Sequence, residues 1–142
     1  MITDEVVSVP APAGMTPGEV ELLDVAQRLL SRVWVAGRHE VATALRTPDG
    51  AVHTGVHLEG SCRRSSICAE GVALGAPLTV DSVVSVQIKP AGRFRIIAPC
   101  GVCRELISDY SPQARVWITT VDGQVTAIQA IDLLPEKTRR AW

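Results

Sequence analysis

The stretch APCGVCRELI, residues 98–107, places two cysteines three positions apart, behind a proline and ahead of an apolar run. A C-x-x-C pair of this kind can hold a metal ion, act as a redox couple or fill a core, and the stretch alone leaves all three open. Residues 94–98 before it are typical of a strand, and residues 103–110 are typical of a helix. The pair therefore lies where a strand is followed by a helix, as in an α/β fold.

Outward from this stretch, strand-like and helix-like segments follow one another along the chain. Thr16, Pro17 and Glu19 form a capping-box pattern that predicts an amphipathic helix ending near residue 34. Pro48-Asp49-Gly50 predicts a hairpin turn. The other predicted elements are strands at 41–45, 52–56, 83–88, 115–120 and 125–128 and short helices at 67–74 and 130–135. This order predicts a three-layer α-β-α sandwich around a five-stranded mixed sheet.

Length and composition predict one main globular domain. The 142 residues carry a net charge of −1, so we expect no broad electrostatic attraction to nucleic acid or to anionic membranes. No apolar run approaches the roughly 20 residues that span a bilayer, and the acidic start of the chain is unlike a signal peptide. We expect a cytoplasmic protein with a flexible segment at 1–15, a single domain at 16–142 and an exposed basic tail.

Three of the four cysteines coincide with predicted helix starts and suggest a metal site. Cys68, Cys100 and Cys103 would each lie at the positive end of a helix dipole, which lowers the thiol pKa and favours the thiolate that metal binding needs. Zinc takes four ligands, so a closed structural site would add His53 or His57. A catalytic site would instead leave one position to water. The fourth cysteine, in the polar stretch GSCRRSS, is interpreted as a loop thiol.

Glu70 favours the catalytic alternative. It follows Cys68 by two residues, on the first turn of the predicted helix. At this spacing a carboxylate can reach a water on the metal without becoming a ligand, and can move the proton of that water. Alone, Glu70 would be interpreted as a glutamate stabilised by the helix dipole. Beside three cysteines, it is interpreted as the catalytic acid and base.

The combined pattern resembles a known family. Cys68-Ala69-Glu70 followed by Pro99-Cys100-Gly101-Val102-Cys103 resembles the zinc-dependent nucleoside deaminases, whose first ligand is His or Cys. Thr54-Gly55-Val56-His57-Leu58-Glu59 is similar to the segment G-x-N-x-E of cytidine deaminases. From about residue 17 onward, the chain resembles the small, all-cysteine, homotetrameric cytidine deaminases, including the blasticidin S deaminases.

The resemblance implies hydrolytic deamination of cytidine, deoxycytidine or a closely related cytosine nucleoside, as in pyrimidine salvage. One zinc ion per subunit would be held by Cys68, Cys100 and Cys103, and Glu70 would carry the protons. Glu59 would bind a ribose hydroxyl. The expected partners are a small-molecule nucleoside and further copies of the chain, as a tetramer or a dimer.

The expected substrate contacts include departures from the family pattern. The resemblance implies that the backbones of Ala69 and Pro99 read the edge of the base. His57 replaces the asparagine that grips the ribose, so it would shift the sugar, serve a different sugar, or be a tolerated histidine at a strand end. His39 stands where the family usually places a phenylalanine near the base, and is a candidate substrate contact. Gly71 replaces an arginine that offsets the thiolate charge in many all-cysteine members.

These departures leave the compensating cation and the substrate open. Arg104 is one candidate for the missing cation, while Arg63 and Arg64 form either a second candidate or a solvated loop pair. Thr138 stands near the place where relatives put an aromatic residue, and Trp142 is the nearest aromatic. One alternative function is deamination of a modified cytosine nucleoside such as a blasticidin-like antibiotic. The other is a zinc-stabilised binding protein without catalysis.

Overall fold

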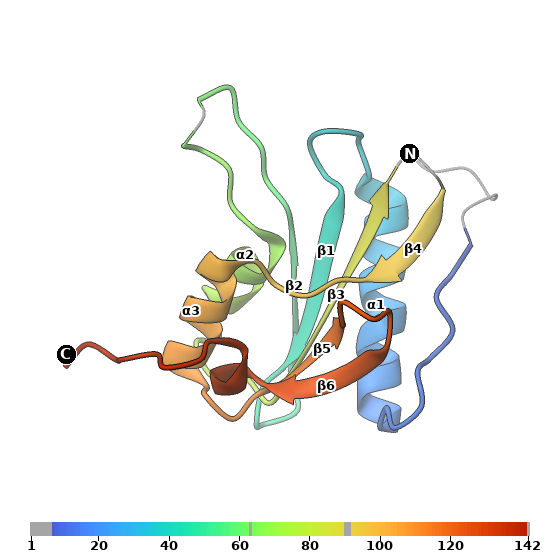
Figure 1. Cartoon of the computed structure of the whole chain (residues 1–142). Helices are drawn as coiled ribbons and strands as arrows, with labels where there is room; N and C mark the ends of the chain where they lie inside the picture. Colours follow the sequence, from blue (N-terminus) through green and yellow to red (C-terminus); the bar gives the residue numbers. More distant parts are fainter. Residues whose placement is uncertain (1–6, 63, 90–91, 142) are drawn as a thin grey trace.

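The computed structural model describes residues 7–62, 64–89 and 92–141, and its elements follow the predicted order (Figure 1). The elements are α1 (Pro17–Val33), β1 (Val41–Arg46), β2 (Val52–Val56), α2 (Ala69–Leu74), β3 (Ser82–Lys89), β4 (Arg93–Ile96), α3 (Gly101–Tyr110), β5 (Arg115–Thr119), β6 (Val125–Gln129) and the 3₁₀ helix η1 (Ala130–Leu133). The predicted α/β architecture is confirmed.

The sheet is mixed, as predicted, but it has six strands. Five of them form a continuous path in the order β2-β1-β3-β5-β6, and β4 pairs with β3 beside this path. Residues 82–83 of β3 run parallel to β5, whereas residues 86–89 of β3 pair antiparallel with β4. The sheet therefore includes all six predicted strands, one more than the five expected to form it, because β3 is long enough to hold two neighbours in line along one edge.

Helices cover both faces of the sheet, which confirms the three-layer arrangement. α1 lies on one face, and α2 and α3 lie on the other (Figure 1). Successive residues of β3 alternate between the two cores, as the pleat of a strand requires. Val84 and Val86 pack in the core that includes Leu22 of α1, whereas Val83 packs in the core that includes Ile107 of α3.

Gly55 allows α2 to lie directly on β2. A Cβ atom at this position would lie 2.4 Å from the carbonyl oxygen of Ala69 and 2.6 Å from the amide nitrogen of Ala73, distances that packed atoms do not reach. The glycine therefore determines how closely the start of α2 approaches the sheet. Cys68 is the N-cap of that helix, so this approach also positions its sulfur.

Both ends of the described chain lie against the domain. The amide of Val7 donates to Gly92 O, and the amide of Val9 donates to the side chain of Gln27. Residues 1–6 lie outside the described residues, so the division into a flexible segment at 1–15 and a domain at 16–142 stays a prediction. In the basic tail, the side chain of Lys137 is only 4% exposed and lies 2.9 Å from a carboxylate oxygen of Asp109 on α3. The expectation of an exposed tail was wrong at this residue, because α3 supplies acidic partners.

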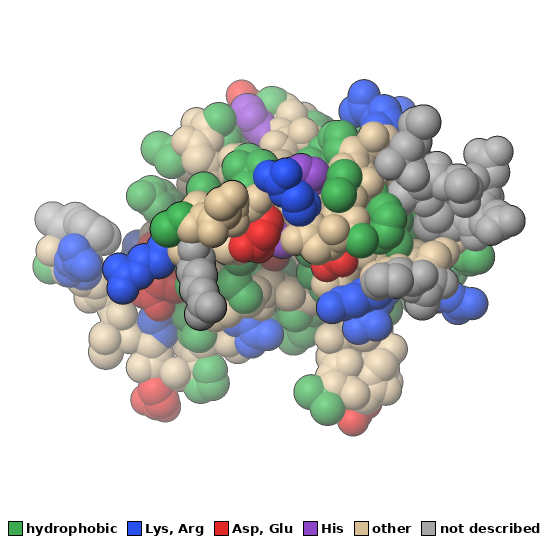
Figure 2. All heavy atoms as spheres, turned by 90° about the horizontal axis from the view of Figure 1, so that it is seen from above, with side chains coloured by type: hydrophobic (Ala, Val, Ile, Leu, Met, Phe, Trp, Pro, Cys, Tyr) green, Lys and Arg blue, Asp and Glu red, His purple; other side chains and the backbone are tan. Residues whose placement is uncertain are grey.

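The described surface carries no dominant charge of one sign on the face seen in Figure 2. Acidic, basic and histidine side chains are interspersed among the atoms drawn in colour there. Within the described ranges, no helix is both long and apolar enough to cross a membrane.

Candidate metal centre and active site

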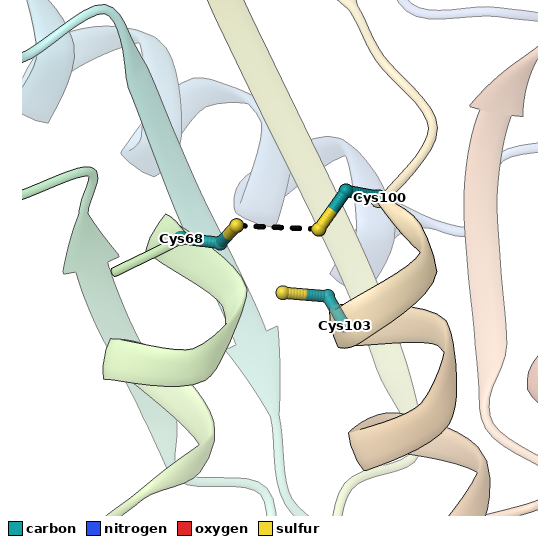
Figure 3. A group of neighbouring side chains, drawn as sticks. All are labelled: Cys68, Cys100 and Cys103. Carbon is teal, nitrogen blue, oxygen red and sulfur yellow. Dashed lines mark hydrogen bonds between the residues drawn. The ribbon is translucent and has the colours of Figure 1, made fainter. Parts of the chain in front are cut away.

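The starts of α2 and α3 bring three cysteines together. Cys68 is the N-cap of α2 and Cys100 the N-cap of α3, each with extended backbone, and Cys103 lies in the first turn of α3. The three sulfur atoms lie within 4.8 Å of one another, and those of Cys68 and Cys100 are 3.3 Å apart. Figure 3 shows the three side chains pointing into the space between the two helices. The helices thus combine residues separated by more than thirty positions into one group of sulfur ligands.

This sulfur group is closed on one side and open on the other. Cys103 is 1% exposed and belongs to the core between the sheet and α3, whereas Cys100 is exposed. No histidine or carboxylate joins the group among the residues that the structure describes. His57, one of the two histidines considered as a fourth ligand, points its Nε2 atom at Glu59 instead. The donor set therefore has three ligands and an accessible side.

The thiols differ from the expectation that every helix start lowers their pKa values. Burial raises the pKa of Cys68 to about 11, and the neighbouring Cys100 and Glu70 act in the same direction. Burial, Glu70 and the other two thiols also raise the pKa of Cys103. Burial acts to raise the pKa of Cys100 as well, but hydrogen bonds from the backbone of Cys103 and from the neighbouring thiols lower it. Only at Cys100 do hydrogen bonds at the helix start outweigh burial and lower the pKa of the thiol. At Cys68 and Cys103, burial and neighbouring negative charge raise it.

The donor set suits a soft divalent cation. Burial is the largest cause of the raised pKa values of Cys68 and Cys103, and negative charge on the neighbouring groups adds to it. A metal ion supplies positive charge, and zinc binds thiolates in tetrahedral sites. Cys68, Cys100 and Cys103 can therefore hold a metal ion, and a fourth position would remain on the open side.

Glu70 lies beside this group on the first turn of α2. Its residue is 4% exposed, and burial raises the pKa of its carboxyl group, while hydrogen bonding by Ser85 and the charge of His57 lower it. The Ser85 hydroxyl is itself 2.7 Å from the hydroxyl of Thr43 on β1. A buried carboxyl group with a raised pKa is suited both to accept and to return a proton. The pair of hydroxyl groups beneath it was not expected from the sequence.

The segment before α2 carries the other polar candidates. Leu58 and Ile67 exchange two backbone hydrogen bonds of 2.9 Å, which close the loop between them. Glu59 is thereby held near the start of α2, and its Oε1 atom lies 2.9 Å from Nε2 of His57. The Nδ1 atom of His39 lies 2.8 Å from the carbonyl oxygen of His57. A carbonyl oxygen only accepts, so Nδ1 of His39 carries the proton. These pairings were missed, because spacing does not show side-chain direction.

The remaining candidates are placed by backbone contacts or lie outside the site. Pro99 is buried, and its carbonyl oxygen accepts a 2.9 Å hydrogen bond from Nε of Arg104. A second guanidinium nitrogen of Arg104 donates to Leu133 O, so this residue binds carbonyl groups and not the sulfurs. At Gly71 an added Cβ would meet side-chain atoms no closer than 3.9 Å, which leaves room for a larger residue. Ala69 is buried at the start of α2, Arg64 is exposed, and Arg63 and Trp142 lie outside the described residues.

Known proteins resemble the chain in sequence and in fold. The chain is 32% identical over 131 residues to a blasticidin-S deaminase of Bacillus cereus, covering 86% of this chain and 93% of that protein. It is 30% identical over 101 residues to a cytidine deaminase of Halalkalibacterium halodurans, covering 69% and 76%. The crystal structure of a cytidine deaminase from Burkholderia pseudomallei superposes with a TM-score of 0.70 at 28% identity, covering 87% of this chain and all of that one. No protein-family model matches.

Proposed function

The chain belongs to the cytidine deaminase family, and we propose that it hydrolyses the exocyclic amine of a cytosine nucleoside with one zinc ion per subunit. The observation that carries this proposal is the meeting of Cys68, Cys100 and Cys103, with sulfurs within 4.8 Å, beside the buried carboxyl group of Glu70. Three ligands and one adjacent proton carrier form the minimal set for hydrolysis at an electrophilic carbon.

Cys68, Cys100 and Cys103 would hold the metal as thiolates. Zinc, when bound, supplies the Lewis acidity that activates water at neutral pH. Glu70 takes a proton from the attacking water and gives it to N3 of the cytosine ring as the new C4–O bond forms. It then takes the proton of the new C4 hydroxyl group and passes it to the departing amine, the C4–N bond breaks as the C4=O bond forms, and ammonia and the uridine form leave. Burial of Glu70 supports this role, because a raised pKa eases both accepting and returning the proton.

The rest of the substrate would lie between the start of α2 and the segment before it. We assign the edge of the base to the backbones of Ala69 and Pro99, and the sugar to Glu59 with His57. His39 would complete this side, because its Nδ1 atom is engaged by the backbone and its Nε2 atom remains an acceptor. The pairing of His57 with Glu59 occupies one carboxylate oxygen that a ribose hydroxyl would otherwise use. This pairing supports a substrate whose sugar is not ribose, as in a modified nucleoside. Cytidine and deoxycytidine remain the other candidate substrates.

We also propose that the chain acts as a homo-oligomer, a tetramer or a dimer, in the cytoplasm. Five apolar side chains on α2, on α3 and just before Cys68 are exposed by between 36% and 66%. They are Ile67, Val72, Val102, Leu106 and Tyr110. Apolar side chains gathered on one side of a domain are typical of an association surface. The free state of all four cysteines supports a reducing compartment.

The direct test is an assay of the zinc-loaded protein. Ammonia release and the ultraviolet change would be followed with cytidine, deoxycytidine, cytosine, their 5-substituted forms and blasticidin S. We expect at least one cytosine nucleoside to be deaminated, and free cytosine to react poorly because it lacks the sugar. Full zinc occupancy without ammonia from any of them would instead support the zinc-stabilised binding protein.

A further inference from the structure

A row of basic side chains lies on β3 and β4, on the same face of the sheet as the candidate active site. Lys89 stands opposite Arg93, and Gln87 stands opposite Arg95, in the antiparallel pairing of the two strands. Directly paired residues, and residues two apart on one strand, point to the same face. Lys89, Arg93 and Arg95, the basic row, therefore share the face of Ser85. All three are exposed.

The described part of the chain does not neutralise the basic row. None of its three side chains forms an ion pair with a described acidic side chain. Lys89 and Arg93 are directly opposite, and like charges in that relation destabilise strand pairing. A bound anion would remove this repulsion.

A pocket of about 530 Å³ adjoins the basic row, between β4 and the end of β5. Arg93 and Arg95 line it together with Thr119, Thr120 and residues 96–98, and no described acidic side chain does. Guanidinium groups bind carboxylates and phosphates through parallel hydrogen bonds, so two unpaired arginines in one pocket favour an oxyanion.

Thr120 adds a hydrogen-bond donor to this pocket. The hydroxyl of Thr119 is already used, because it donates a 2.6 Å hydrogen bond to Ile96 O. The Oγ1 atom of Thr120 instead accepts from the amide of Gln124 at 3.1 Å, which leaves its own proton for a ligand. The pocket thus offers positive charge and a neutral donor.

Hydrogen bonds of Ser85 on β3 link the lining of the pocket to Glu70 of the candidate active site. The amide of Ile97 donates a 3.0 Å hydrogen bond to Ser85 O, and the Ser85 side chain hydrogen-bonds to Glu70. Arg95 lies two residues before Ile97, which is about 7 Å along an extended strand. The backbones of Arg95 and Ser85 are therefore separated by about the length of a nucleoside.

We propose that this pocket binds an oxyanion, a carboxylate or a phosphate, that the cytosine nucleoside carries. The enzyme would then prefer an anionic cytosine nucleoside to cytidine. The substrate part of this inference rests on the proposed deaminase function, whereas binding of the anion itself does not require catalysis.

The first experiment measures binding without turnover. Isothermal titration of the zinc-loaded protein would compare uridine, uridine 5′-phosphate and uridine 5′-carboxylate. We expect roughly tenfold or greater affinity for an anionic form, the size of one hydrogen bond to a charged group. Arg95→Gln should bring the affinity ratio close to one. The control is Arg32→Gln, an exposed arginine in the last turn of α1 on the other face, which should leave the ratio unchanged.

Adding inorganic phosphate to this experiment distinguishes binding of a free anion from binding of an anionic group on the nucleoside. Competition of inorganic phosphate with the anionic nucleosides, lost in Arg95→Gln, would support the pocket. Binding of inorganic phosphate without any advantage for an anionic nucleoside would overturn the proposal, since the anion would then not belong to the substrate. Equal affinity for all three nucleosides, or an equal loss in the Arg32→Gln control, would overturn it too.

Kinetics keep this inference separate from the deaminase function. The ratio of kcat/KM between cytidine 5′-phosphate or 5′-carboxylate and cytidine should exceed one and fall in Arg95→Gln. Turnover of cytidine without any anionic advantage would refute the pocket and retain the deaminase. An Arg95-dependent affinity without turnover of any cytosine nucleoside would support the pocket and refute the deaminase.

Discussion

Residues from three other parts of the fold influence the carboxyl group of Glu70 by hydrogen bonding or by charge. Ser85 of β3 hydrogen-bonds to it, Thr43 of β1 supports Ser85, and His57 acts on it by charge. Burial is the largest influence on the pKa of this carboxyl group and raises it, although a hydrogen bond with the backbone of Glu70 itself acts to lower it. A buried carboxyl group beside a metal site is most simply retained for proton transfer.

Replacing Glu70 with glutamine should separate metal binding from catalysis. The amide keeps the size of the side chain but cannot accept and return a proton, so we expect kcat to fall by about 10³-fold or more. Zinc content should stay at one ion per subunit, because Glu70 is outside the sulfur group. Metal analysis and single-turnover kinetics would check both. Retention of most of the activity would refute the proposed proton carrier.

His57 offers a second prediction at the residue scale, on substrate choice. His57→Asn removes the ring from Oε1 of Glu59 and frees that oxygen for a ribose hydroxyl. We expect kcat/KM for cytidine to rise several-fold relative to that for blasticidin S. His53→Asn, on β2 shortly before His57, is the matched control and should leave the ratio unchanged. An unchanged ratio in both variants would show that the pair does not select the sugar.

At the scale of elements, Glu19 joins the start of α1 to β5. It completes the capping box with Thr16 through hydrogen bonds of 3.0 and 3.1 Å. It also accepts two hydrogen bonds from Arg115 and one of 2.8 Å from the indole of Trp117. Burial acts to raise the pKa of Glu19, but these hydrogen bonds lower it from 4.5 to about 2. The capping box follows from local sequence, whereas the contacts with β5 do not.

This network should make stability depend on pH. The pKa is lower in the folded than in the unfolded chain, so the stabilisation is complete above pH 4.5 and is lost as the pH falls towards 2. This lowering of the pKa of Glu19 contributes on the order of 3 kcal/mol to the free energy of unfolding. Glu19→Gln keeps the cap but loses the charge, and it should flatten this part of the pH profile.

Denaturant unfolding followed by tryptophan fluorescence would measure the effect at several pH values. The control is Glu21→Gln on the same helix, because Glu21 is more than half exposed in its ion pair with Arg46. Exposed pairs contribute about 1 kcal/mol or less. Loss of metal from the thiols at low pH affects all variants alike. Parallel pH profiles of the wild type and Glu19→Gln would therefore contradict the prediction.

At the scale of the whole molecule, the sulfur group joins the starts of two helices, α2 and α3. Cys68 begins α2 and Cys100 begins α3, so a bound metal ion would hold the two helix starts together. Arg104 adds a second link, from the carbonyl group before Cys100 to that of Leu133 at the end of η1. Loss of the metal ion should therefore also weaken the packing of α2 and α3 on the sheet.

Removal of zinc should lower stability as well as activity. We expect chelation to reduce the melting temperature by several degrees or more, and Cys100→Ser to abolish both zinc binding and this response to chelator. Cys100 is exposed, so its replacement leaves the core intact. Cys62→Ser, another exposed cysteine outside the group, should retain zinc and the response. A melting temperature independent of chelator in the wild type would contradict the link.

The sequence by itself determined the order of the elements and the candidates for the site. Capping, turn and spacing patterns act over a few residues, so Thr16 with Glu19, Pro48-Asp49-Gly50 and Cys100 with Cys103 could be interpreted without the fold. The roles of the site residues remain predictions. Only the tertiary structure decided the place of β4 on β3, in line with β5, the raised pKa values of Cys68 and Cys103, and the partners of Glu19. Desolvation and contacts between distant residues arise when elements pack together, and spacing along the chain does not contain them.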